Sequence, residues 1–102
     1  MLDLIEARRA EVVQICQRYQ VKRLDVFGSA ASGDFDSEAS DLDFVVEFEP
    51  LSPVPYKRAY FAMLAELEAL FRRKVDLVTT GSLRNPDFVS NVERTRELVY
   101  GG

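Results

Sequence analysis

The chain has 102 residues, of which 47% are hydrophobic, so it is expected to form one domain, residues 1–102, around a modest core. Its 17 acidic and 13 basic residues give a net charge of −4, and a single cysteine with no histidine excludes histidine-dependent catalysis, histidine-bound zinc and an internal disulfide. No segment has the ~20 apolar residues of a membrane span or the apolar stretch of a signal peptide, which predicts a soluble, cytoplasmic protein.

The first half of the chain is predicted to contain one helix and two strands. Apolar residues recur at helical spacing over residues 2–20, and Cys16 lies in this apolar stripe, where we expect it to be buried. Residues 23–28 alternate and end in glycine, and residues 41–49 are rich in β-branched and aromatic side chains, so each predicts a strand. The intervening residues 29–40 are small, polar and acidic, and predict a loop.

The second half predicts a helix, a strand and a final helix. Prolines interrupt residues 50–55, after which helical spacing of apolar residues indicates a helix over residues 56–71. A strand follows over residues 74–79, then a helix over residues 86–99 and a frayed end over residues 100–102. The apolar side of the 56–71 helix is expected to carry Tyr60, Phe61, Leu64, Leu67 and Phe71. The order α-β-β-α-β-α predicts an α/β (α+β) fold, a small mixed sheet flanked by helices.

Acidic residues are concentrated in one stretch of the chain. Residues 24–56 contain eight carboxylates and no lysine or arginine, whereas the remainder contains 13 basic and 9 acidic residues. Such a stretch is often only a solvated loop, but it is also typical of a site that holds cations.

Two of these carboxylates, Asp41 and Asp43, lie two residues apart in a predicted strand. Alternate strand residues project from the same face, so both side chains are expected to point the same way. Adjacent like charges disfavour each other's ionisation unless a cation lies between them, and Mg²⁺ prefers oxygen ligands. The alternative is that both carboxylates simply face water at the start of the strand.

Asp76 interrupts the apolar strand predicted over residues 74–79. If this strand neighbours the 41–49 strand, three carboxylates can converge and hold two divalent ions, as phosphoryl and nucleotidyl transfer require. The alternative is that Asp76 forms a salt bridge with Arg72, Arg73 or Lys74.

Gly28 and Ser29 follow the first predicted strand. Glycine permits a backbone turn that other residues resist, and a helical turn after it would present N–H groups to a phosphate. The Ser29 hydroxyl would add a donor. Taken alone, the pair is more often an ordinary turn.

Three segments together resemble the minimal nucleotidyltransferase (MNT) family, within the DNA polymerase beta-like nucleotidyltransferase superfamily. They are residues 26–29 (VFGS), 41–46 (DLDFVV) and 74–78 (KVDLV), and the resemblance covers nearly the whole chain. Ser40, directly before the aspartate pair, also matches the family pattern and is assigned to the nucleotide site on that ground. The resemblance implies a nucleotidyltransferase fold.

The resemblance also implies roles for individual residues. Gly28 and Ser29 would hold the triphosphate, and Asp41 and Asp43 would bind two Mg²⁺ ions. Asp76 would be the third metal ligand and the base for the incoming hydroxyl.

The resemblance further implies a partner and a reaction. Short members of the family act as antitoxins that bind a HEPN-domain RNase toxin and transfer AMP from ATP to a tyrosine of that toxin. The expected partners are therefore a HEPN-domain toxin and a nucleoside triphosphate, with no direct contact to nucleic acid or membrane. The chain could also form a homo- or hetero-oligomer.

The loop departs from the family pattern at two positions. Ala30 and Ser32 stand where members often carry arginine, so two phosphate-neutralising charges are absent, and Arg23, Arg84 or a partner chain would have to supply the cation. This departure favours an alternative function, a binding module that neutralises the toxin by complex formation alone. A third alternative is an enzyme that modifies a small molecule such as an antibiotic.

Overall fold

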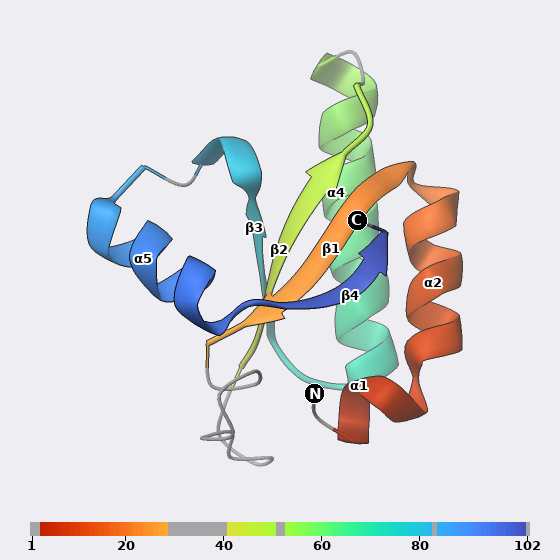
Figure 1. Cartoon of the computed structure of the whole chain (residues 1–102). Coiled ribbons are helices and arrows are strands. Elements are labelled where there is room, and N and C mark those ends of the chain that lie inside the picture. The colour runs from red at the N-terminus through yellow and green to blue at the C-terminus, as the bar shows by residue number, and fades with distance from the viewer. Residues whose placement is uncertain (1–2, 29–40, 51–52, 83, 102) are drawn as a thin grey trace.

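A four-stranded mixed sheet forms the centre of the molecule, with helices on both faces (Figure 1). The computed structural model describes residues 3–28, 41–50, 53–82 and 84–101. In chain order its elements are α1 (Asp3–Ala7), α2 (Arg9–Arg18), β1 (Val21–Phe27), β2 (Leu42–Phe48), α4 (Pro53–Phe71), β3 (Val75–Thr79), the 3₁₀ turn η1 (Thr80–Ser82), α5 (Pro86–Thr95) and β4 (Glu97–Gly101). The predicted mixed sheet flanked by helices is confirmed.

The strands lie in the order β3-β2-β1-β4. β1 is antiparallel to both β2 and β4, whereas β2 and β3 are parallel, with Asp43 opposite Asp76. The parallel β2–β3 pair is possible because α4 connects the two strands across one face of the sheet. β3 therefore neighbours β2, which is the condition on which the approach of Asp76 to Asp43 depends.

Alternation along the strands separates a large and a small hydrophobic cluster. The larger cluster lies between the sheet and α1, α2 and α4, and Leu24, Phe44, Met63 and Leu67 are fully buried in it. The smaller one lies under α5 on the opposite face and consists of Phe27, Val45 and Val92, with Val78 packed against them. Within the described segments, no helix combines the length and apolarity needed to cross a membrane.

The single helix predicted over residues 2–20 is wrong in one respect, because Arg8 separates α1 from α2. Ile5 and Val12 are both fully buried on either side of this break. Because the turn at Arg8 keeps the apolar residues on one side, their spacing in the sequence does not reveal the break between α1 and α2.

The helix predicted over residues 86–99 ends earlier than expected. α5 stops at Thr95, Arg96 adopts an extended backbone, and residues expected to be helix or frayed end form β4 against β1. Gly101 has a φ of +83° and lies so close to β1 that an added Cβ would be 2.1 Å from the Lys22 carbonyl oxygen. Alternation in a five-residue strand directly after a helix is too short to distinguish from a continuing helix.

The helix predicted over residues 56–71 begins three residues earlier, at Pro53. Proline is tolerated in the first turn of a helix, where its missing N–H has no helical partner. Phe71 is buried as expected, but Phe61 is 65% exposed and so does not belong to the buried side of α4.

The thiol of Cys16 is buried as predicted, and its burial raises its pKa to about 12 from 9.0. The folded chain is therefore expected to react with a thiol reagent such as DTNB at least about a thousandfold more slowly than the unfolded chain, since each pKa unit lowers the thiolate fraction tenfold. Labelling followed with and without urea measures this ratio. Rapid, stoichiometric labelling of the folded chain would contradict the buried position of Cys16.

Candidate active site

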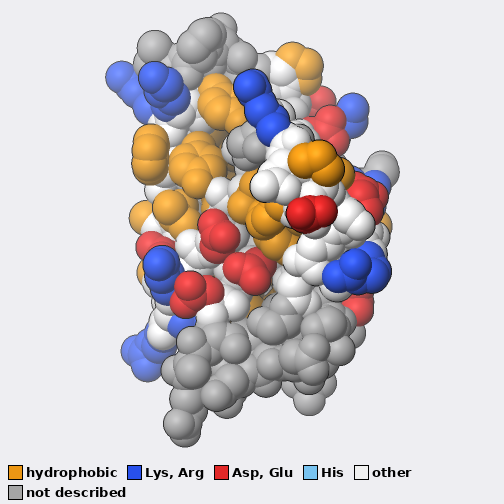
Figure 2. All heavy atoms as spheres, turned by 90° about the vertical axis from the view of Figure 1, so that its left-hand side faces the viewer, with side chains coloured by type: hydrophobic (Ala, Val, Ile, Leu, Met, Phe, Trp, Pro, Cys, Tyr) orange, Lys and Arg blue, Asp and Glu red, His pale blue; other side chains and the backbone are white. Residues whose placement is uncertain are grey.

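Two of the three predicted carboxylates, Asp43 and Asp76, lie on the face of the sheet that α5 partly covers. Asp43 in β2 and Asp76 in β3 are direct partners in the parallel register, and Asp41 immediately precedes β2. Asp43 is half-buried, whereas Asp41 and Asp76 are exposed. Figure 2 shows acidic side chains gathered in the middle of this face, with hydrophobic side chains beside them. The structure therefore brings Asp43 and Asp76 together as expected.

The charges of these residues act on one another. Burial, followed by the negative charges of Asp76 and Asp41, raises the pKa of Asp43 to about 6 from 3.8. Asp76 forms no ion pair with another described residue, so the predicted alternative of a salt bridge to Arg72, Arg73 or Lys74 is wrong. A cation placed between the carboxylates would remove the repulsion that raises the pKa of Asp43.

The donor set suits a hard divalent cation, because Asp41, Asp43 and Asp76 offer only oxygen ligands. Over the described segments, no three acidic or thiol side chains lie close enough to enclose an ion. The site is therefore open, with Asp43 and Asp76 as its neighbouring pair, and ligands from a substrate would be needed to complete a coordination shell.

Gly28 directly follows β1 and lies against Asp43. Its φ of +69° is left-handed, and an added Cβ would be 2.7 Å from Oδ2 of Asp43. Its N–H donates a hydrogen bond to Oγ1 of Thr95 at 2.9 Å. Glycine is thus required here by both the backbone conformation and the approach of Asp43.

Replacing Gly28 with alanine is therefore expected to destabilise the fold by about 1–3 kcal/mol, the cost of a left-handed backbone and a displaced carboxylate. Urea unfolding followed by circular dichroism measures the difference. Gly81→Ala is the matched control, because a Cβ at Gly81 has no neighbour within 4 Å and should change stability by less than about 1 kcal/mol. Equal stability of the two variants would show that Asp43 does not restrict Gly28.

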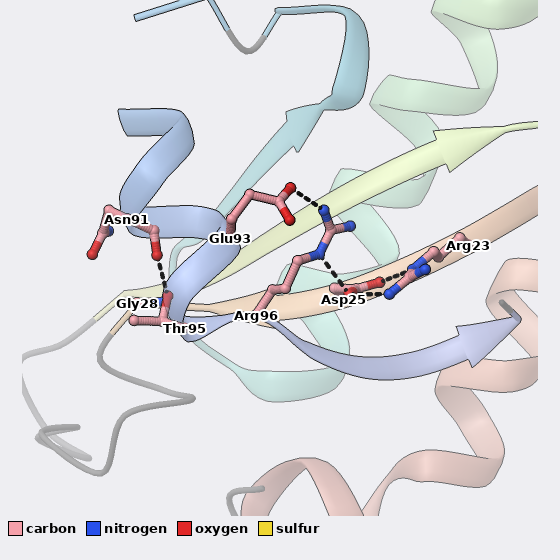
Figure 3. A network of polar contacts seen from close by, with 7 residues as sticks. All are labelled: Arg23, Asp25, Gly28, Asn91, Glu93, Thr95 and Arg96. Atoms are coloured by element: carbon pink, nitrogen blue, oxygen red, sulfur yellow. Dashed lines mark hydrogen bonds and ion pairs between the residues drawn. The ribbon is translucent and has the colours of Figure 1, made fainter. Parts of the chain in front are cut away.

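An ion-pair network centred on the buried Asp25 lies on the same face, farther along β1 (Figure 3). Asp25 has no exposed surface and accepts hydrogen bonds from Nε of Arg23 at 2.7 Å and Nε of Arg96 at 2.8 Å. Arg96 also donates to Glu93 at 2.8 Å. Burial disfavours ionisation of Asp25, but the two arginines outweigh it and lower the pKa of its carboxyl below 3.8.

The sequence did not indicate this network. Asp25 was only one of eight carboxylates in the acidic stretch, and Arg23 was a candidate phosphate ligand, whereas the structure pairs it with Asp25. Arg96 is 71 residues from Asp25 in the chain, and sequence spacing carries no sign of such a contact. Ser29 and Ser40, predicted to bind nucleotide, and Ala30 and Ser32, where arginine was expected, lie outside the described residues.

Comparisons with known proteins agree on the family. The nucleotidyltransferase domain family matches residues 10–99. A Methanocaldococcus jannaschii protein named "Putative protein adenylyltransferase" is 36% identical over 83 residues, which cover 81% of this chain and 79% of that protein. A solved "putative minimal nucleotidyltransferase" is 34% identical, with a TM-score of 0.67 over 94% of this chain and 95% of the other.

A more distant structure shares the fold. It is the complex of a tri-AMPylated Shewanella oneidensis HEPN toxin with an MNT antitoxin, matched at 17% identity and a TM-score of 0.64 over 95% of this chain and 72% of the other. At this identity the match bears on the fold alone. Because the domain match and the two closer relatives each span most of the chain, the chain belongs to the nucleotidyltransferase domain family.

Proposed function

We propose that the chain transfers AMP from ATP to a hydroxyl group of a protein partner, and that this partner is a HEPN-domain toxin modified on tyrosine. The observation that carries the proposal is the Asp43–Asp76 pair, flanked by Asp41 and placed against the left-handed Gly28. The name of the Methanocaldococcus jannaschii relative and the AMPylated toxin in the distant complex support the reaction and the partner.

Asp41, Asp43 and Asp76 would together hold two Mg²⁺ ions, with substrate phosphates completing the open site. Bound Mg²⁺ would neutralise charge on the triphosphate and on the attacking oxygen. Asp76 would accept the proton of the partner's hydroxyl, a role supported by its exposed position on β3 beside Asp43. The hydroxyl oxygen forms a bond to the α-phosphorus as the bond to the bridging oxygen breaks, and pyrophosphate leaves.

Gly28 would position the phosphate-binding loop rather than bind phosphate through its own amide. Its N–H is already donated to Thr95, so that group is not free for a phosphate oxygen. We assign phosphate contacts to Ser29 and to the backbone that follows it, with Ser40 at the other end of the loop.

Neutralisation of the toxin by complex formation alone is the second candidate function. It is favoured by the pairing of Arg23 with buried Asp25, which removes one of the three cation sources considered for the triphosphate. With uncharged Ala30 and Ser32 in the loop, Arg84 or the partner would then supply the charge.

The test is incubation of the chain with Mg²⁺, α-³²P-ATP and the HEPN-domain protein proposed as its partner. We expect label on the partner, lost when its acceptor tyrosine is changed to phenylalanine, and no label when Mg²⁺ is removed by EDTA. Co-expression with the toxin separates the two functions, since a variant lacking all three aspartates should fail to restore growth if transfer is required. Restored growth without any labelling would instead establish the binding module.

A further inference from the structure

The C-terminal end of α5 contacts β1 through two consecutive residues (Figure 3). Thr95 Oγ1 accepts the N–H of Gly28 at 2.9 Å, and Nε of Arg96 donates to Asp25 at 2.8 Å. Both contacts join residues more than 60 positions apart in the sequence. One is made to Asp25, near the end of β1, and the other to Gly28, directly after it. The position of α5 and the position of Gly28 are thus coupled.

The Thr95 hydroxyl has a fixed orientation. Its hydrogen is donated to the Asn91 carbonyl oxygen of the preceding helical turn at 2.7 Å, which leaves an oxygen lone pair to accept from Gly28. The hydroxyl therefore holds the Phe27–Gly28 peptide plane in one orientation.

This peptide plane matters because little space surrounds Gly28. A Cβ at its α-carbon would already be 2.7 Å from Asp43 Oδ2, so small shifts of Gly28 alter the room available to that carboxylate. One hydroxyl on α5 therefore bears on the position of the Asp43 carboxylate.

We propose that Thr95 is a positioning residue for the nucleotide site: its hydroxyl fixes Gly28 against Asp43 and so holds that carboxylate in place for the metal and the nucleotide. This inference rests on the proposed function for its substrate. It gives α5, which carries none of the predicted carboxylates, a role in positioning Asp43.

The test compares Thr95→Val, which keeps the shape but loses the hydroxyl, with Thr95→Ser, which keeps it. Binding of Mg²⁺ with α,β-methylene ATP, an analogue that cannot release AMP, is measured by calorimetry. We expect Thr95→Val to weaken binding about three- to tenfold, as the loss of one hydrogen bond predicts, and Thr95→Ser to restore it. Ser90→Val, at an exposed position of α5, controls for a β-branched residue in the helix.

A second readout does not depend on nucleotide. Hydrogen exchange followed by NMR should show that the Gly28 amide of the unmodified chain exchanges slowly with deuterium. Thr95→Val should accelerate exchange at Gly28 while the amides of β1 keep their rates. In the transfer reaction, Thr95→Val should raise the KM for ATP more than it lowers kcat, which a general loss of stability would not do.

The outcomes separate this inference from the proposed function. A chain that transfers no AMP, yet binds the analogue in a Thr95-dependent way, would refute the function and support the positioning role. Unchanged analogue affinity in Thr95→Val, or a Gly28 amide that exchanges in the unmodified chain as fast as an unprotected one, would overturn the positioning role whatever the transfer assay shows. The exchange rate of the Gly28 amide is measured on the unmodified chain, so this outcome decides the question even if Thr95→Val does not fold.

Discussion

Replacing Asp43 with asparagine is expected to reduce AMP transfer about a thousandfold or more while the fold remains intact. Asp43 is the central carboxylate, opposite Asp76 in the sheet and two residues from Asp41. Its loss would therefore remove the metal ligand that lies between the other two. Asparagine keeps the shape and one oxygen but not the charge. Labelling of the proposed HEPN partner with α-³²P-ATP measures the loss.

The same substitution is expected to leave the metal-free chain equally stable or more stable, by on the order of 1 kcal/mol. The pKa of Asp43 is raised to about 6, so above that pH the folded chain carries an ionised carboxylate in a site that disfavours its charge, which lowers its stability relative to the unfolded chain. Added Mg²⁺ should raise the melting temperature of the unmodified chain and leave that of Asp43→Asn unchanged. Thermal unfolding at about pH 7.5, with and without Mg²⁺, measures both effects.

Glu47→Gln is the matched control, because Glu47 lies on the same strand and the same face but pairs with Lys22 at 3.9 Å, away from the site. It should keep both transfer activity and the Mg²⁺-dependent stabilisation. If Asp43→Asn keeps more than a tenth of the transfer activity, Asp43 is not a metal ligand and the assignment of the three carboxylates fails.

Three of the four strands, and the neighbouring positions of Asp41 and Asp43, could be predicted because both depend on local patterns. Alternation fixes the face of a strand within a few residues, so Asp41 and Asp43 could be placed together, and the α4 connection makes β2 and β3 parallel neighbours. The register that sets Asp43 opposite Asp76 could not be predicted, since it depends on how α4 packs.

The parts that the sequence did not predict depend on contacts between distant residues. β4 exists because β1 has a free edge that Glu97–Gly101 can pair with, and a five-residue segment has too little pattern to indicate this. Asp25 and Arg96 are both ordinary charged residues in the sequence, and only folding brings them together. The Thr95–Gly28 contact is missed for the same reason.

Asp25→Asn is expected to destabilise the fold by about 3 kcal/mol, because it leaves two arginines without the buried charge that they share. Asp25 has no exposed surface, and the side chain of Arg96 is only 19% exposed. For a domain of this size the loss corresponds to a fall in melting temperature of roughly 10–20 °C. Asp87→Asn, an exposed substitution in the first turn of α5, should cost less than about 1 kcal/mol and serves as the control.

The effect of Asp25→Asn should depend on pH in a defined direction. The folded-state pKa of Asp25 lies below the unfolded value of about 3.8, so its charge stabilises the fold above that pH and ceases to do so as the pH falls through the folded-state pKa. The difference in unfolding free energy between the unmodified chain and Asp25→Asn should therefore be constant from about pH 5 to pH 7 and shrink at more acidic pH. Urea unfolding at a series of pH values measures it.

The two arginines should contribute unequally to this network. Arg23 is 40% exposed, so water can partly replace its contact with Asp25, whereas Arg96 is more buried and also anchors the junction of α5 and β4. Arg96→Gln is therefore expected to destabilise the fold more than Arg23→Gln. Because Arg96 adjoins Thr95, its loss should also accelerate hydrogen exchange at Gly28, whereas Arg23→Gln should not. If Arg96→Gln and Arg23→Gln have equal effects on stability and on exchange at Gly28, the contact between Asp25 and Arg96 does not couple α5 to the site.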